Sequence, residues 1–218
     1  MKKYKYIFWD LDGTISDSGE GIINSVSYAL EHMGTPVPGN EILRKFVGPP
    51  LAESFEKYFG YSDEKTDEAV IFFREYYQSK GIDENHIYAG IAELLQKLTD
   101  AGYICVVATA KPEPLARTIL KRYGIDKLFL YIAGSTFDDT RTKKEAVIAY
   151  ALETCGITDK SQVIMVGDRA HDCIGAKVNG LDCIGVLYGY GEREELEEAG
   201  VIAIAADIDE LTGLLLNN

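Results

Sequence analysis

Long apolar runs and positive charge are the features that this sequence has least of. No stretch approaches the roughly 18 apolar residues of a membrane-spanning helix, and Lys5 and Asp10 interrupt the N-terminal apolar run, unlike a secretory signal peptide. Lysine and arginine number 22 against 35 acidic residues, giving a net charge of −13. We therefore expect a cytoplasmic protein that binds neither membranes nor nucleic acid polymers, whose phosphates attract positive charge.

Cysteine and histidine are also scarce and lack the spacing of metal ligands. The four cysteines form no CxxC or zinc-like pattern, and the chain has three histidines. We expect the cysteines to be buried, reduced thiols. Hydrophobic residues make up 46% of the chain and charged residues 26%, which is typical of a globular protein. A length of 218 residues suits one large domain or one domain with an insert.

Several short runs of apolar, β-branched and aromatic residues are typical of buried strands. They are Tyr4–Trp9, Tyr103–Ala108, Leu128–Ala133, Val163–Val166 and Cys183–Leu187. From residue 90 onward these runs alternate with segments whose apolar residues recur at helical spacing. This alternation predicts an α/β fold in which a parallel sheet carries helices on both faces.

Residues 16–87 differ, because helical patterns follow one another there with no strand between them. The predicted helices are Gly19–Met33, Asn40–Val47, Leu51–Phe59 and Asp63–Lys80. Their aromatic residues recur at helical spacing and are typical of a packed interior. We interpret this block as a small all-α cap domain, inserted into a core made of residues 1–15 and 88–218.

Reactive residues follow several of the predicted strands, and two lysines open a later helix. In chain order they are Asp10, Asp12, Thr109, Ala110, Lys111, Lys143, Lys144, Asp168, His171 and Asp172. Because the carboxyl ends of parallel strands meet at one edge of a sheet, we expect most of these residues to converge there. His171 is the exception, for which a structural place between Asp168 and Asp172 is expected.

The chemistry of this set is that of phosphoryl transfer. Carboxylates without nearby cysteine or paired histidine suit Mg²⁺, a hard cation held by oxygen atoms. A carboxylate such as Asp10 can act as a nucleophile toward phosphorus, and an acid two residues later can donate and accept protons. A lysine would add the positive charge that a phosphoryl group needs, and Lys111, Lys143 and Lys144 remain candidates.

Thr109 allows two interpretations that are compatible with each other. If a helix starts at Lys111-Pro112, Thr109 caps its N-terminus. The N–H groups of a helix N-terminus also bind phosphate, so Thr109 and Ala110 are candidates for holding a phosphoryl group.

These residues resemble the four motifs of the haloacid dehalogenase-like phosphohydrolases, in the branch that includes phosphoglycolate phosphatases and 5′-nucleotidases. The motifs occur in order as DLDGT (Asp10–Thr14), Thr109–Pro112, a lysine near Lys144 followed by EAVI, and GDRxxD (Gly167–Asp172). The resemblance covers essentially the whole chain. It implies a Rossmann-like core and the small α-helical cap.

The resemblance also implies a role for each matching residue. Asp10 would be the nucleophile, and Asp12 the general acid and base. Asp10 and Asp168 would bind Mg²⁺ through their carboxylates, Asp12 through its backbone carbonyl, and Asp172 indirectly. Thr109, Ala110 and Lys144 would bind the phosphoryl group.

An aspartate at position 12 favours a phosphatase over the ATPases and dehalogenases of the same superfamily. The expected reaction is Mg²⁺-dependent hydrolysis of a small phosphorylated metabolite through an aspartyl-phosphate, by a monomer or weak homodimer. The alternatives are a phosphomutase of the β-phosphoglucomutase type, an inorganic pyrophosphatase and a non-catalytic binding protein.

Two further segments resemble the family. The loop KFVGPPL resembles the part of the cap that contacts substrate, which makes Lys45 and the backbone near Gly48 candidates for substrate binding. The segment GVLYGYG (Gly185–Gly191) is also similar to this branch, and we expect it to shape the core beside the last motif.

Overall fold

The computed structural model describes residues 4–138 and 140–216, and the chain divides into two compact units. One unit is Asp17–His86, and the other contains the residues before and after it. The chain passes between them at two short strands that pair with each other, β2 (Ser16–Asp17) and β3 (His86–Ile87). Within the described ranges, no helix is both long and apolar enough to cross a membrane.

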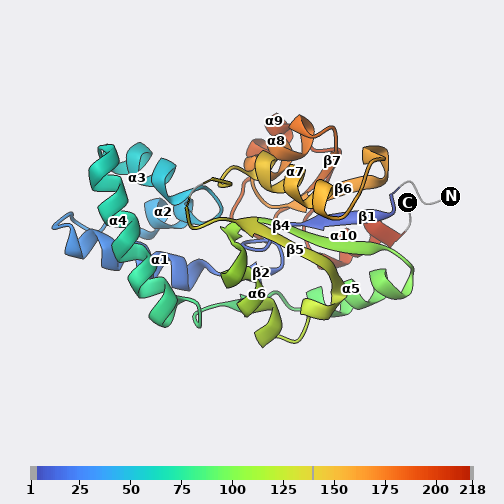
Figure 1. Ribbon diagram of the computed structural model, residues 1–218, viewed down its shortest axis with the longest axis horizontal. Coiled ribbons are helices and arrows are strands. Elements are labelled where there is room, and N and C mark those ends of the chain that lie inside the picture. The colour runs from blue at the N-terminus through green and yellow to red at the C-terminus, as the bar shows by residue number, and fades with distance from the viewer. Residues whose placement is uncertain (1–3, 139, 217–218) are drawn as a thin grey trace. The chain divides into compact units, whose positions relative to one another are not determined.

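The larger unit contains a six-stranded parallel sheet in the order β5-β4-β1-β6-β7-β8 (Figure 1). Its strands are β1 (Tyr6–Trp9), β4 (Ile104–Pro112), β5 (Phe129–Ser135), β6 (Val163–Gly167), β7 (Asp182–Val186) and β8 (Ala203–Ala205). All five predicted strand regions are present. Strand β8 was not predicted, because Ala-Ile-Ala is too short to show a periodicity.

The first strand lies at the centre of the sheet, between β4 and β6. Phe8 is opposite Val106 on one side and Met165 on the other. Ile7, Phe8 and Trp9 are fully buried, as expected for a strand that is covered on both faces. This central position brings the two residues that follow β1 to the middle of the carboxyl edge.

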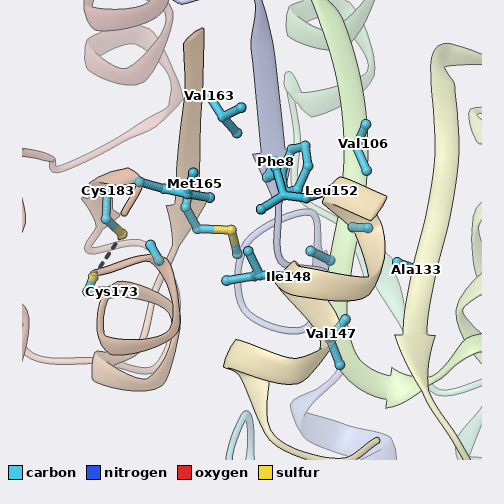
Figure 2. Close-up of a cluster of buried hydrophobic side chains, with 14 of the residues drawn as sticks. Phe8, Val106, Ala133, Val147, Ile148, Leu152, Val163, Met165, Cys173 and Cys183 are labelled. Carbon is cyan, nitrogen blue, oxygen red and sulfur yellow. Dashed lines mark hydrogen bonds between the residues drawn. The ribbon is translucent and has the colours of Figure 1, made fainter. Parts of the chain in front are cut away.

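Helices cover both faces of the sheet, which confirms the predicted α/β fold (Figure 1). They are α5 (Ile91–Asp100), α6 (Glu113–Arg122), α7 (Lys144–Thr154), α8 (Ala170–Val178), α9 (Arg193–Ala199) and α10 (Ile208–Leu216), with short 3-10 turns at Asp126–Leu128 and Lys160–Gln162. On one face, Phe8 and Met165 pack with Ile148 and Leu152 of α7 (Figure 2).

The cysteines are free thiols, and three of the four are buried. Cys105 and the pair formed by Cys173 and Cys183 lie in the interior, with the two sulfur atoms of the pair 2.9 Å apart (Figure 2). Burial raises the pKa of the Cys105 thiol to about 12. A thiol with so high a pKa stays protonated and unreactive at neutral pH.

The smaller unit is helical. It contains α1 (Gly19–His32), α2 (Asn40–Leu43), α3 (Leu51–Phe59) and α4 (Asp63–Tyr76). Two predicted helices are shorter than expected: a 3-10 turn, Arg44–Phe46, follows α2, and a π-helical turn, Tyr77–Gly81, follows α4. The first turn directs Phe46 into the interior, where its ring lies 5.1 Å from that of Phe55.

Candidate functional site

The candidate residues gather at the carboxyl edge of the large sheet. Asp10 and Asp12 follow β1, and Asp168 follows β6. Lys144 is the first residue of α7, and Asp172 lies in the first turn of α8. Strand and helix boundaries distant in sequence therefore bring charged side chains together at one edge, where parallel sheets bind their ligands.

Lys144 is the lysine that contacts Asp10. Its Nζ lies 2.6 Å from Asp10 Oδ1 and 2.7 Å from Asp172 Oδ1, and donates to the backbone oxygen of Ala108 at 3.0 Å. Burial disfavours the ammonium charge, but the two carboxylates outweigh this effect and raise the pKa of Lys144 above its ordinary value. Lys143, by contrast, is exposed at the N-cap of α7.

Lys111 forms a second buried ion pair in the site. Its Nζ lies 2.9 Å from Asp12 Oδ2, and both side chains are less than a tenth exposed. The other oxygen of that carboxylate, Asp12 Oδ1, is buried and has no hydrogen-bond partner among the described residues. Lys144 thus contacts Asp10, and Lys111 contacts Asp12.

Thr109 does not cap a helix, so that interpretation is wrong. Strand β4 continues to Pro112, which pairs with Ser135 of β5, and α6 begins only at Glu113. Proline disfavours a helical conformation of the residue before it, which keeps Lys111 extended. Thr109 is buried, and its hydroxyl oxygen accepts a hydrogen bond from the backbone N–H of Lys111 at 3.2 Å. Ala110 lies beside it and is half-buried.

Asp168 is held by two segments that lie far from it in the sequence. The backbone N–H of Tyr190 donates to Asp168 Oδ2 at 2.8 Å, and the Thr14 hydroxyl lies 3.4 Å from Oδ1. Burial, together with the charges of Asp172 and Asp10, raises the pKa of Asp168 well above its ordinary range. These surroundings therefore disfavour the charged form of Asp168.

Asp10 has the same kind of environment. Burial and the nearby charge of Asp172 raise its pKa to about 6, although Lys144 opposes the shift. One carboxylate oxygen from each of Asp10, Asp168 and Asp172 lies within 4.8 Å of the others. Asp172, expected to act on a metal indirectly, thus lies within the cluster, where its Oδ2 accepts from the N–H of Arg169 at 3.1 Å.

Two glycines allow the backbone to approach Asp168 this closely. Gly13 has a φ of 81°, and a Cβ atom there would lie 2.2 Å from Asp168 Oδ2. A Cβ atom on Gly189 would lie 2.3 Å from the backbone oxygen of Gly13. Only glycine is compatible with contacts this short, so both segments are fixed against the carboxylate.

The site contains every buried charged side chain among residues 4–138 and 140–216. They are Asp10, Asp12, Lys111, Lys144, Asp168 and Asp172. Four carboxylates and two ammonium groups leave a formal charge of −2. This excess, with oxygen atoms as the available donors, fits a hard divalent cation.

Sequence reasoning identified these six residues but missed Thr14, Tyr188 and Tyr190 as parts of the site. The signal for the tyrosines was the segment Gly185–Gly191, which lies against Asp168. His171 is half-buried on α8. Lys45 and Gly48 belong to the helical unit, where Lys45 is exposed and its ammonium lies 6.0 Å from the Tyr58 ring centre.

Comparison with known proteins agrees with this arrangement. Residues 7–186 match the family described as haloacid dehalogenase-like hydrolase. The chain belongs to the haloacid dehalogenase-like hydrolases. The resemblance of its motifs to that family is thereby confirmed.

Three individual relatives are similar to this hydrolase over nearly its whole length. A 5′-nucleotidase of Pseudomonas aeruginosa is 40% identical over 98% of this chain and 96% of its own. A solved structure described as a predicted phosphatase from Clostridium acetobutylicum is 43% identical, with a TM-score of 0.96 over 99% of both chains. The tyrosine-protein kinase PtkA of Mycobacterium tuberculosis is 40% identical over 94% of this chain and 70% of its own.

Proteins named phosphoglycolate phosphatase are similar at lower identity, 26% and 29% in two Vibrio species. Together with the family match, these likenesses identify the chain as a phosphatase-type hydrolase.

Proposed function

We propose that this hydrolase cleaves small phosphomonoesters, of the 5′-nucleotide or phosphoglycolate type, through a phosphoryl group carried on Asp10. The observation that carries the proposal is the pairing of two neighbouring aspartates with two different buried lysines, Asp10 with Lys144 and Asp12 with Lys111. The two carboxylates have different environments, because Asp10 shares its lysine with Asp172 whereas Asp12 contacts Lys111. Two different chemical roles require such a difference.

The site fits Mg²⁺ by its charge and its donor atoms. Four buried carboxylates against two lysines leave an excess of negative charge, and oxygen atoms are the ligands that Mg²⁺ prefers. Asp10 and Asp168 would bind the ion through carboxylate oxygens and Asp12 through its backbone carbonyl, with Asp172 close by. When bound, the ion would neutralise charge on the phosphoryl oxygens.

In the first step, a carboxylate oxygen of Asp10 attacks phosphorus and the bond from phosphorus to the ester oxygen breaks. Asp12, which must be in its protonated form for this step, gives its proton to the departing oxygen. In the second step Asp12 takes a proton from water, whose oxygen attacks phosphorus and releases phosphate and the Asp10 carboxylate. Lys144 favours the ionised form of Asp10 against the effect of burial, because its Nζ lies 2.6 Å from Asp10 Oδ1.

We assign the binding of the phosphoryl group to Thr109, the Ala110 N–H and Lys144. The Thr109 hydroxyl accepts from the Lys111 N–H, which leaves its hydrogen available for donation. Residues 17–86 are inserted directly after the Asp10–Thr14 turn, and we assign them the selection of substrate, with Lys45 and the backbone near Gly48 as contacts. The names of the relatives supply the substrate classes.

The test is phosphate release from 5′-nucleotides, 2-phosphoglycolate, pyrophosphate and a sugar phosphate, each with Mg²⁺ and with EDTA. Asp10→Asn should lower turnover by roughly 1,000-fold or more, because it removes the nucleophile. Asp67→Asn, the same change on an exposed position of α4, is the matched control. Acid quenching followed by mass spectrometry should find one phosphoryl group on the peptide that contains Asp10.

The alternatives give different outcomes in the same experiment. A phosphomutase would isomerise the sugar phosphate without releasing phosphate, and a pyrophosphatase would prefer pyrophosphate. A binding protein would be stabilised by ligands without turnover. Transfer of phosphate to tyrosine instead of water would indicate a kinase. Substantial activity of Asp10→Asn would remove Asp10 as the nucleophile.

A further inference from the structure

Tyr188 connects two segments that hold Asp168. Its hydroxyl donates to the backbone oxygen of Thr14 at 3.0 Å. Thr14 approaches Asp168 Oδ1 from one side, and the N–H of Tyr190, two residues after Tyr188, donates to Asp168 Oδ2 from the other. One phenol hydroxyl therefore ties the turn after β1 to the segment after β7.

We propose that Tyr188 is a positioning residue, which fixes the Asp168 carboxylate for binding a divalent cation by tying the Thr14 turn to the Tyr190 segment. The proposal rests on the proposed function, because it concerns the same cation. Tyr188 itself does not touch the reacting atoms, and acts through Thr14 and Tyr190.

The physical reason is that Asp168 needs restraint. Carboxylate oxygens of Asp168, Asp10 and Asp172 lie within 4.8 Å of one another, and like charges this close repel each other, so an unrestrained Asp168 carboxylate would turn away from Asp10 and Asp172. The Thr14 contact, at 3.4 Å, is too long to hold it alone. The Tyr190 hydrogen bond is short, but its donor is a backbone group, whose position depends on how the segment is anchored.

The segment is anchored by a hydrogen bond at Leu187 and packed at Gly189. Leu187 N–H donates to the backbone oxygen of Ala205 in β8 at 2.9 Å. Gly189 packs against the backbone oxygen of Gly13, where no Cβ atom would fit. Between these contacts, the Tyr188 hydroxyl gives the segment a directional bond to the Thr14 turn. Removal of the hydroxyl would leave the packing of Gly189 in place, but the segment would lose its directional hydrogen bond to Thr14.

The aromatic ring of Tyr188 has a second contact. The ring of Tyr88 packs edge-on against it, with the ring centres 5.0 Å apart. Tyr88 directly follows β3, where the chain returns from residues 17–86, and its N–H donates to the backbone oxygen of Ile15 at 3.2 Å. The ring of Tyr188 is thus supported from the chain segment that connects the two units.

The test compares Tyr188→Phe with Tyr103→Phe. Tyr103 is a buried tyrosine whose hydroxyl also donates to a distant backbone oxygen, that of Leu215 at 2.8 Å. It precedes β4 and so lies at the opposite edge of the sheet. Both variants lose one hydrogen bond of the same kind, and both should lower the thermal midpoint by about 2–4 °C in EDTA.

The deciding measurement is the affinity for Mn²⁺ without substrate, read from the free-ion signal in electron paramagnetic resonance, with Mg²⁺ as competitor. Tyr188→Phe should weaken binding roughly 3–10-fold, less than the 10-fold or more that is typical when a direct partner of a metal ligand is lost, because Tyr188 acts through Thr14 and Tyr190. Tyr103→Phe should bind as the wild type does. Equal affinities of the two variants would overturn the proposal.

The experiment separates this proposal from the proposed function. If the wild type binds neither Mn²⁺ nor Mg²⁺, both fail. If the wild type binds and Tyr188→Phe binds equally, the positioning role alone fails. Should circular dichroism show that Tyr188→Phe is unfolded, Tyr88→Leu decides, because it removes ring support from Tyr188 and should weaken Mn²⁺ binding about 2–3-fold. Wild-type affinity in that variant would count against the role.

Discussion

The carboxyl edge of the sheet and the interior of the helical unit are both buried, but they contain opposite kinds of side chain. The edge holds the six buried charged residues of the described chain. The helical unit has aromatic rings in its interior, including Phe46 and Phe55, and its buried polar residues are uncharged. The first arrangement works against stability and the second supports it.

This difference indicates that the carboxyl edge of the sheet serves a chemical function more than it serves stability. A buried ion pair is often no more stable than apolar residues of the same size, so stability alone does not explain six charges at one edge. Asp10 and Asp168 both have raised pKa values, which means that their charged forms are disfavoured where they lie. A site of this kind is expected to gain stability when a cation binds.

The largest effect on stability should come from Lys144→Met. The change leaves Asp10 and Asp172 without their shared cation at 2.6 and 2.7 Å. Loss of one partner from a buried pair lowers the free energy of unfolding by about 3–5 kcal/mol. Urea denaturation in EDTA measures it.

Lys143→Met is the matched control, since Lys143 is the exposed neighbour. It should change the free energy of unfolding by less than about 0.5 kcal/mol. Equal losses of unfolding free energy in the two variants would show that the buried ion pairs at the carboxyl edge contribute no more to stability than an exposed lysine does.

A smaller effect is expected in the helical unit. Phe55 is fully buried, and Phe55→Leu should lower the free energy of unfolding by about 1–2 kcal/mol through lost packing. The loss should be the same in Mg²⁺ and in EDTA, because no buried charge is altered. Phe59→Leu, at a half-buried position of the same helix, should have a smaller effect. If the stability lost in Phe55→Leu depended strongly on Mg²⁺, the contrast between the charged carboxyl edge and the apolar interior of the helical unit would be wrong.

The smallest effect should have the opposite sign. Asp168→Asn removes a charge that burial and two acids disfavour, so in EDTA at pH 7 it should raise the free energy of unfolding by about 1 kcal/mol. A raised pKa means that the folded state holds its proton more tightly than the unfolded state. The wild type therefore loses stability as pH rises above the ordinary aspartate pKa, and the gain of the variant should disappear near pH 3.

The response of Asp168→Asn to Mg²⁺ completes this test. The wild type should gain thermal stability when Mg²⁺ is added, and the variant should gain little, because it lacks a carboxylate that we propose binds the ion. Differential scanning calorimetry with and without Mg²⁺ measures both. A variant that is less stable than the wild type in EDTA would show that Asp168 supports the fold.

The sequence predicted the fold because its signals are local. The strand around Phe8 and the helices near Ile148 and Phe55 show their periodicity within a few residues. The acids of the site were predictable for another reason: Asp10, Asp12 and Asp168 follow strands, Asp172 lies in the first turn of the helix after β6, and parallel strands end at the same edge.

What the sequence did not predict depends on contacts between distant segments. The interpretation of Thr109 as a helix cap was wrong, because pairing of Pro112 with Ser135 extends β4 past it. Residue spacing alone left three lysines as candidates, and the family resemblance favoured Lys144, which is the one that contacts Asp10. The role that we assign to Tyr188 depends on a hydrogen bond to a residue 174 positions away, which no local pattern indicates.

The central position of β1 has a consequence for synthesis on the ribosome. β1 is made first, yet its two neighbours are β4 and β6, which begin near residues 104 and 163. At about 5–20 residues per second, the Phe8–Trp9 segment waits roughly 10–30 s for its second neighbour. Asp10 likewise meets Asp168 and Asp172 only after most of the chain has been made. A nascent chain that has not reached β6 therefore exposes at least one unpaired edge of an apolar strand, a ready target for chaperones, and the acid cluster is complete only after Asp172 has been made.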